Sequence, residues 1–323
     1  MAIVGGVAES GESGESGESG ESGESGSTVS VSLGARPGRP IGVSPKVTGI
    51  TITTTAGTTT WWPGDRWPPD GLPATWPNMP LGTGFLNAGT AFPESAWGPD
   101  YYAFVVLADF VAAPGPPGPW NNMPASVPPP NPATVAGQKK IGDELVELAQ
   151  LVYYRPSVLA EAMAQNASIL QYFSGILSFN LRSHPATVYL CTVALRIGSF
   201  QVMHYKYTAD RARPSRLAPR LMPPIDPPGH ASFPSGHATQ SRLIALCLEQ
   251  VMPAAIVPAN PQDGPLRRMA DRIARNREVL GLHYPTDSVA GKTLADLTFQ
   301  RMTPLAKVAN LIAVAQTEWA PRV

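Results

Sequence analysis

The sequence predicts a mainly α-helical bundle, preceded by an irregular arm rich in proline and tryptophan and by a low-complexity tail. Three observations support this fold class. Apolar residues recur at helical spacing through the C-terminal half of the chain. Prolines or a serine stand where those stretches begin, as at helix starts. The connections between the stretches are short, which favours antiparallel packing of neighbouring helices.

The first two segments have compositions that disfavour long helices. Residues 1–27 contain six Glu-Ser-Gly repeats, which cannot build a core, and we expect them to form a disordered tail. Residues 28–134 are expected to form an extended arm that packs on the core through its tryptophans, because many prolines interrupt it. Within this arm, the β-branched stretch 47–54 favours a strand, and residues 101–112 favour a helix.

Residues 135–323 are expected to form the helical domain. Two apolar stripes come first, and four longer stretches follow that begin at a proline or just after a serine. The helices are expected near 141–152 and 158–177, and over 185–207, 236–252, 265–282 and 285–315.

Overall composition excludes several classes of partner. Lys and Arg number 24 and Asp and Glu also 24, so no net charge attracts nucleic acid or an anionic membrane. No run of 18 apolar residues and no secretory signal are visible, so we expect a soluble, cytoplasmic protein without a membrane span. Cys191 and Cys247 lie in apolar helical patterns and are expected to be buried thiols, which fits a reducing compartment.

The stretch Phe233–Ala238, FPSGHA, is the first candidate for a functional site. Ser235 is a good N-cap for the apolar-periodic run that follows, so a helix begins at Gly236 and its free N–H groups face an approaching ligand. That geometry favours an oxyanion, and His237 beside it titrates near neutral pH. The alternative is an ordinary capped helix.

Two further charged patches have regular spacing. Lys206 and Arg213 lie seven residues apart, which is two helical turns, so both can face the same way; the alternative is a basic helix end that meets the helix dipole. Arg277, His283 and Asp287 surround the start of the last helix, where the aspartate can accept from Nδ1 of the histidine and leave Nε2 free. Asp287 could equally be a first-turn cap.

Together, the three patches resemble the signature of the phosphatidic acid phosphatase type 2 and vanadium haloperoxidase superfamily. The first part of that signature, Lys, six residues, Arg-Pro, is KYTADRARP here, and the second part is PSGH at 234–237. The third part is NREVLGLHYPTD at 276–287, where Asn276 replaces the serine of the signature. The resemblance covers roughly residues 140 to 300 and implies the helical bundle of this superfamily for residues 135–323.

The resemblance also implies one oxyanion site with assigned roles. The residues that would bind phosphate or vanadate are Lys206, Arg213, Ser235, Gly236 and Arg277. In the phosphatases, His283 would attack phosphorus, Asp287 would hold its tautomer, and His237 would protonate the leaving oxygen. In the haloperoxidases, His283 would instead bind vanadate, and His237 would act as acid and base for peroxide.

The choice between the two branches depends on weaker features. The lack of apolar spans and of an export signal favours the haloperoxidase branch, with vanadate as cofactor and a halide and hydrogen peroxide as substrates. His230 stands seven residues before His237, at the spacing of a second catalytic histidine in bromide-using haloperoxidases. The sequence GLHYPTDS resembles the phosphatases, so the alternative is a soluble acid phosphatase that hydrolyses phosphomonoesters without a cofactor. A non-catalytic helical scaffold that retained the motif is the third alternative.

Overall fold

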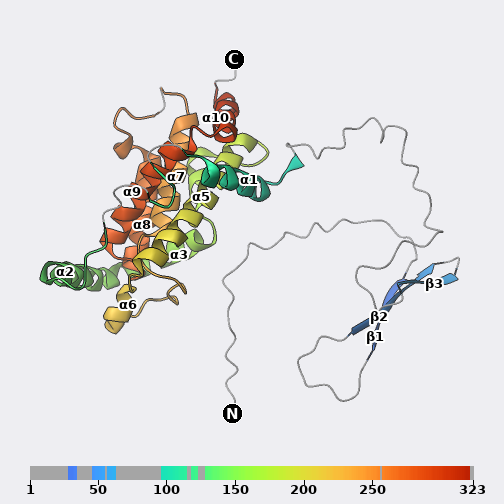
Figure 1. The fold of residues 1–323 in the computed structure, drawn as a ribbon, viewed down its shortest axis with the longest axis horizontal. Helices are drawn as coiled ribbons and strands as arrows, with labels where there is room; N and C mark the ends of the chain where they lie inside the picture. The colour runs from blue at the N-terminus through green and yellow to red at the C-terminus, as the bar shows by residue number, and fades with distance from the viewer. Residues whose placement is uncertain are drawn as a thin grey trace, which may run out of the picture. The chain divides into compact units, whose positions relative to one another are not determined.

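The computed structural model describes the helical part of the chain almost completely (Figure 1). The described residues are the backbone of 28–34, 46–54 and 57–62, together with 96–114, 118–122, 128–254 and 257–320. The expected disordered tail, 1–27, lies outside the described residues, as does most of the tryptophan-rich arm. The chain forms two compact units, Met1–Ala91 and Phe92–Val323.

The described part of the first unit is a three-stranded antiparallel sheet in the order β1, β2, β3. The strands are β1 (Thr28–Gly34), β2 (Lys46–Thr54) and β3 (Gly57–Trp62). The strand expected at 47–54 corresponds to β2. The expectation that this part of the arm packs on the core stays a prediction.

The second unit is helical, which confirms the mainly α fold class. Its α-helices are α1 (Pro99–Ala112), α2 (Val135–Leu151), α3 (Arg155–Ala167), α4 (Leu170–Leu177), α5 (Pro185–Ala209), α6 (Pro214–Leu217), α7 (Gly236–Val251), α8 (Pro265–Val279), α9 (Pro285–Met302) and α10 (Ala306–Glu318). This unit begins at Phe92 and includes α1. The domain boundary expected at residue 135 stays a prediction.

Helices α5 and α7 form the centre of this unit (Figure 1). Helix α5 packs against α1, α7 and α10, and α7 packs against α8 and α9. The packing of α9 on the start of α7 is close: a Cβ atom on Gly291 would lie 2.6 Å from the backbone oxygen of Ser235. Only glycine permits this approach, which brings the start of α7 against the second turn of α9. Cys191 and Cys247 are buried free thiols, as expected.

Three expected helices differ from the structure. The helix expected over 158–177 is two helices, because α3 ends at Ala167 and Ser168 has extended dihedral angles. The helix expected over 285–315 is also two, α9 and α10, with Pro304 in the connection; proline has no N–H and its ring clashes with the carbonyl four residues before it. Helix α8 ends at Val279, and Gly281 follows with φ of 75°.

Helix α5 ends at Ala209, before Pro214, and Pro214 is the first residue of the four-residue helix α6. Proline is favoured at this position since its N–H would have no intrahelical partner. In the part of the chain that the structure describes, one helical stretch, 185–217, is long and apolar enough to span a membrane, with a mean hydropathy of 1.3. In the 18-residue segment of this stretch to which that hydropathy refers, 61% is buried inside the protein, so the stretch is weak evidence for a membrane span. The absence of a membrane span stays a prediction.

Candidate active site

The site residues expected from the sequence come from the ends of four helices and the loops that join them. Lys206 lies in the last turn of α5 and Arg213 precedes α6; Ser235, Gly236 and His237 begin α7; Arg277 lies in the last turn of α8; His283 and Asp287 flank the start of α9. The C-terminal end of α5 leads into α6, so the site lies at the end of the unit where Figure 1 labels α6.

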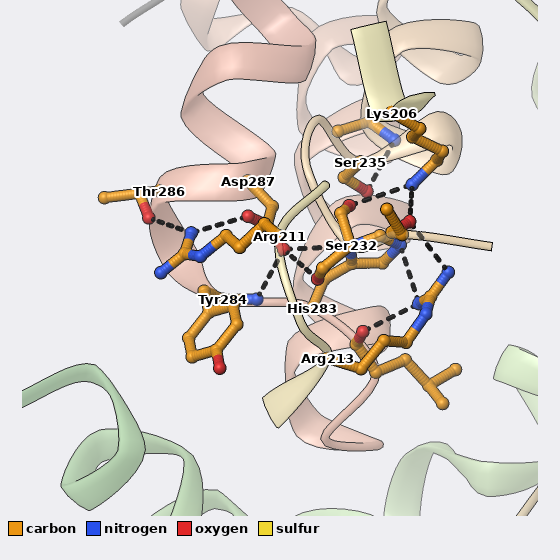
Figure 2. Close-up of polar contacts among 12 residues, drawn as sticks. Lys206, Arg211, Arg213, Ser232, Ser235, His283, Tyr284, Thr286 and Asp287 are labelled. Atoms are coloured by element: carbon orange, nitrogen blue, oxygen red, sulfur yellow. Dashed lines mark hydrogen bonds and ion pairs between the residues drawn. The ribbon is translucent and has the colours of Figure 1, made fainter. Parts of the chain in front are cut away.

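His283 and Asp287 form a buried pair. Nδ1 of His283 lies 3.1 Å from Oδ2 of Asp287, and the same oxygen accepts from the Ser232 hydroxyl at 2.5 Å and the Tyr284 N–H at 3.0 Å (Figure 2). Burial lowers the pKa of His283 to about 3, so the ring is neutral at neutral pH. If Nδ1 carries the proton for Asp287, Nε2 has a free lone pair. Asp287 is also a first-turn cap, so the structure contains both contacts that the sequence suggested, and the role of Asp287 stays a prediction.

Lys206 and Arg213 converge on one backbone segment. The Lys206 ammonium donates to the carbonyls of Ala231 and Ser232, both at 2.8 Å. The Arg213 guanidinium donates to His230 O of the same segment at 3.1 Å. It also donates to Leu282 O at 2.8 Å, and its Nη1 lies 3.4 Å from Nε2 of His283. Burial and the charge of Arg213 lower the pKa of Lys206 to about 7, and burial lowers the pKa of Arg213 to about 10. Each cation is thus held in an environment that favours an added negative charge.

Arg277 and His237 carry buried polar atoms without a partner among the described residues. These atoms are Nε and Nη1 of Arg277 and Nε2 of His237. The third guanidinium nitrogen, Nη2, donates to Ala162 O on α3. Burial, followed by the charges of Arg277 and His283, lowers the pKa of His237 well below its usual value. Asn276, where the chain departs from the superfamily signature, donates to Gln165 on α3 at 3.0 Å.

Ser235 caps α7 as expected. Its Oγ accepts from Ala238 N at 3.4 Å, and its own N–H donates to Asp287 O at 3.0 Å, which joins the first turns of α7 and α9. Gly236 has no steric need for glycine within the protein, because a Cβ there would meet Val202 at an ordinary 3.6 Å. Its predicted role in the close approach of a ligand therefore stays a prediction.

His230 lies at the edge of the site rather than within the buried cluster. Its exposed ring places Nδ1 3.0 Å from Nη2 of Arg213. Both side chains line an open pocket of about 760 Å³, together with Arg216 and the loop residues 227–231. The pocket therefore provides a route from solvent to Arg213.

Four residues whose side chains make polar contacts with Asp287 or Arg211 were not among those expected from the sequence: Glu144, Arg211, Ser232 and Thr286. Arg211 donates to Asp287 Oδ1 at 2.6 Å and to Glu144 Oε2 at 2.9 Å (Figure 2). One signal was present, because Glu144 interrupts the apolar stripe of α2 at a position that faces the core. The sequence around Glu144 does not indicate that its partner is Arg211, which is 67 residues away.

The geometry fits an oxyanion better than any neutral ligand. Lys206, Arg213 and Arg277 are buried cations, and the charges of Arg277 and Lys206 act on His237 at the start of α7. Among the described residues, Nε and Nη1 of Arg277 and Nε2 of His237 have no partner, and an oxygen ligand would satisfy them. Phosphate and vanadate both have the charge and the tetrahedral oxygens that such donors recognise. The residues present therefore fit the oxyanion that the resemblance implies.

Comparison with known proteins gives limited but relevant similarity. No known family model matches the chain. Over 90 residues, the chain is 37% identical to the decaprenylphosphoryl-5-phosphoribose phosphatase of Mycolicibacterium smegmatis. The match covers 27% of this chain and spans 42% of that phosphatase. This relative is a phosphatase, so it supports the phosphatase alternative better than the haloperoxidase interpretation of the sequence.

Oxyanion binding should depend on the charge of Lys206. A bound anion favours the protonated lysine, whose pKa is about 7 without a ligand, so binding takes up a proton and weakens as the pH rises above 7. Sulfate keeps its charge over this range, so we expect its affinity to fall by up to about tenfold per pH unit. Thermal unfolding at pH 6 to 9, with chloride at equal ionic strength as reference, measures this effect.

The control for this prediction is a lysine outside the site. Lys206→Met should bind sulfate weakly and without the pH dependence, whereas Lys292→Met, which removes a surface pair with Asp271, should behave as the unaltered protein. An unchanged pH dependence in Lys206→Met would contradict the assignment.

Proposed function

We propose that this protein is a phosphatase that hydrolyses phosphomonoesters through a phosphohistidine intermediate at His283. The observation that carries the proposal is the buried His283–Asp287 pair: burial keeps the ring neutral, and the contact of Asp287 with Nδ1 leaves Nε2 on the side of Arg213. The similarity to a phosphatase supports this branch of the superfamily.

In the first step, the phosphoryl group of the substrate lies among Lys206, Arg213 and Arg277, which stabilise the charge on its oxygens. Nε2 of His283 attacks phosphorus, so a P–N bond forms and the P–O bond to the leaving group breaks. The carboxylate of Asp287 stabilises the positive charge that develops on the imidazole ring. His237 gives its proton to the leaving oxygen.

In the second step, water hydrolyses the phosphohistidine. His237, now neutral, takes a proton from the water as its oxygen bonds to phosphorus and the P–N bond breaks. Inorganic phosphate and the free His283 ring result. In the ligand-free protein the pKa of His237 is too low for the ring to carry a proton at neutral pH. The bound substrate must therefore raise this pKa, which it does because the negative charge of its phosphate offsets the positive charge of Arg277.

The pocket beside Arg213 and His230 is proposed to hold the leaving group. Its volume of about 760 Å³ can hold a leaving group of moderate size. The named substrate of the relative is a phosphorylated ribose on a polyprenyl phosphate. The match spans less than half of that protein. We therefore propose a phosphomonoester as the substrate class of this chain and propose no lipid substrate.

The haloperoxidase function remains the second candidate, and the position of His230 favours it. His230 touches Arg213, at the edge of the site where a halide could approach bound vanadate. In that function His283 would hold the vanadate, with Lys206, Arg213 and Arg277 around its oxygens. Vanadate supplies activation of hydrogen peroxide for halide oxidation.

The test compares both activities in one preparation. We expect the metal-free protein to release phosphate from phenyl phosphate, with vanadate as a competitive inhibitor. We expect no bromination of a phenol dye by the vanadate-loaded protein with hydrogen peroxide and bromide. Bromination without phosphatase turnover would establish the haloperoxidase function instead. If the protein shows neither activity but still binds sulfate, the third alternative, a non-catalytic helical scaffold, would be supported.

A further inference from the structure

A buried network of charges links α2 to the carboxylate of Asp287. Arg211 reaches Asp287 Oδ1 at 2.6 Å with one guanidinium nitrogen and Glu144 Oε2 at 2.9 Å with another. The side chains of Arg211, Asp287 and Glu144 are 8%, 0% and 1% exposed. Removing charges from water costs several kcal/mol each unless they are paired. Pairing among the three side chains offsets that cost, and the loss of one partner would leave a buried charge unpaired.

The two oxygens of Asp287 have different partners. Oδ2 accepts from Ser232, His283 and the Tyr284 N–H, whereas Arg211 is the donor that reaches Oδ1 in the described part of the chain. Contacts to both oxygens fix the plane of the carboxylate and not only its position. Figure 2 shows Arg211 on one side of Asp287 and the Ser232–His283 pair on the other.

Arg211 is itself held on several sides. Its guanidinium carbon lies 3.7 Å from the centre of the Tyr284 ring, and Nη1 also donates to Thr286 Oγ1 at 2.7 Å. Glu144 binds the second nitrogen and accepts from the Thr286 N–H at 2.8 Å, at the N-terminus of α9. Glu144 thus fixes both the arginine and the helical turn that carries Asp287.

We propose that Arg211, held by Glu144, is a positioning residue that fixes Asp287, so that His283 keeps its Nδ1 proton and presents Nε2 to the substrate. This role deepens the proposed phosphatase function and rests on it for its kinetic test. Neither Arg211 nor Glu144 belongs to the fixed positions of the motif described above.

The charge of Arg211 should also set the acid limit of activity. Burial raises the pKa of Asp287, but the hydrogen bond and charge of His283, the charge of Arg211 and the Ser232 hydroxyl lower it to about 2. Lys206 and Arg213 are the other charges that interact with this carboxylate. Without Arg211 the pKa rises, so the carboxylate is lost at a higher pH as the solution is acidified.

The experiment replaces Arg211 with glutamine. We expect kcat to fall by about 10- to 100-fold, the usual effect of a lost outer-shell partner, with little change in KM. The acid limb of the kcat profile should move to higher pH. Arg211→Lys should recover part of kcat, because it keeps the charge near Asp287. The control is Arg267→Gln, which breaks the similarly buried Arg267–Glu249 pair near the other end of α7 and should change stability alone.

The coupling between Glu144 and Arg211 is tested with a double variant. If Glu144 acts through Arg211, Glu144→Gln should lower kcat, and the double variant should be no slower than Arg211→Gln. Additive effects, or a wild-type kcat and pH profile in Arg211→Gln, would overturn the proposal. Should Arg211→Gln fail to fold, Arg211→Lys and Glu144→Gln provide the same two measurements.

A readout without turnover separates this proposal from the phosphatase function. Nitrogen-15 NMR of histidine-labelled protein reports which ring nitrogen of His283 carries the proton. We expect the Nδ1–H tautomer in the unaltered protein and in Arg267→Gln, and a growing Nε2–H population in Arg211→Gln. If no phosphomonoester is hydrolysed, the proposed function fails and the tautomer still decides the role of Arg211. An unchanged tautomer in Arg211→Gln overturns that role.

Discussion

Replacing His283 with alanine should reduce phosphomonoester turnover by about 10⁴- to 10⁶-fold, the range expected when the nucleophile of an enzyme is removed. The reason is geometric, because Nε2 of His283 is the ring nitrogen that Asp287 leaves free and that lies 3.4 Å from Arg213. Steady-state release of phosphate from phenyl phosphate measures the loss.

Binding and turnover should separate in this variant. Lys206, Arg213 and Arg277 remain, so sulfate should still raise the unfolding temperature of His283→Ala. The control is His184→Ala, since His184 precedes α5 and lies about 30 Å along that helix from Lys206. Wild-type turnover in His283→Ala would refute the assignment of His283 as the nucleophile. Intact turnover together with lost sulfate binding would point to a different anion site.

The helix starts were predictable from the sequence because their signals are local. Pro185, Pro265 and Pro285 are the first residues of α5, α8 and α9, and Ser235 caps α7. A proline at a helix start fixes one dihedral angle and lacks an N–H that would have no partner there, whatever the rest of the chain does. The motif residues lie at the starts and ends of these helices, so the sequence also indicated that the candidate site lies at the helix ends.

The contacts that orient those residues were not predictable. Arg211 pairs with Glu144, which is 67 residues away, and Arg277 is held by α3, which is more than 100 residues away. Such pairs depend on how α2 and α3 pack, and helical periodicity alone does not give that packing. The same limit explains Ser168, where no proline or glycine marks the break between α3 and α4.

The ligand-free site carries an electrostatic cost that an oxyanion would relieve. Burial lowers the pKa of Lys206 to about 7, and of Arg213 and Arg277 to about 10, so each charged form is less favourable here than in water. The unpartnered nitrogens of Arg277 add to this cost. A site with these properties favours ligands with negative charge over neutral analogues of the same shape.

His237 adds a requirement on the leaving group, which leads to the second large effect. With an alkyl phosphate, His237→Ala should lower kcat by about 10²- to 10⁴-fold, because the alkoxide must gain a proton as it leaves. With 4-nitrophenyl phosphate the loss should be far smaller, since nitrophenolate leaves without a proton. Measuring kcat for phosphate esters of graded leaving-group acidity tests this directly.

The slope of log kcat against leaving-group pKa should therefore be shallow in the unaltered protein and steep in His237→Ala. His204→Ala is the control, because His204 lies on α5 against Trp120, and its slope should match the unaltered protein. An equal loss for every ester in His237→Ala would mean that His237 binds the phosphoryl group and does not protonate the leaving oxygen. The unpartnered Nε2 would then be an oxyanion contact like those of Arg277.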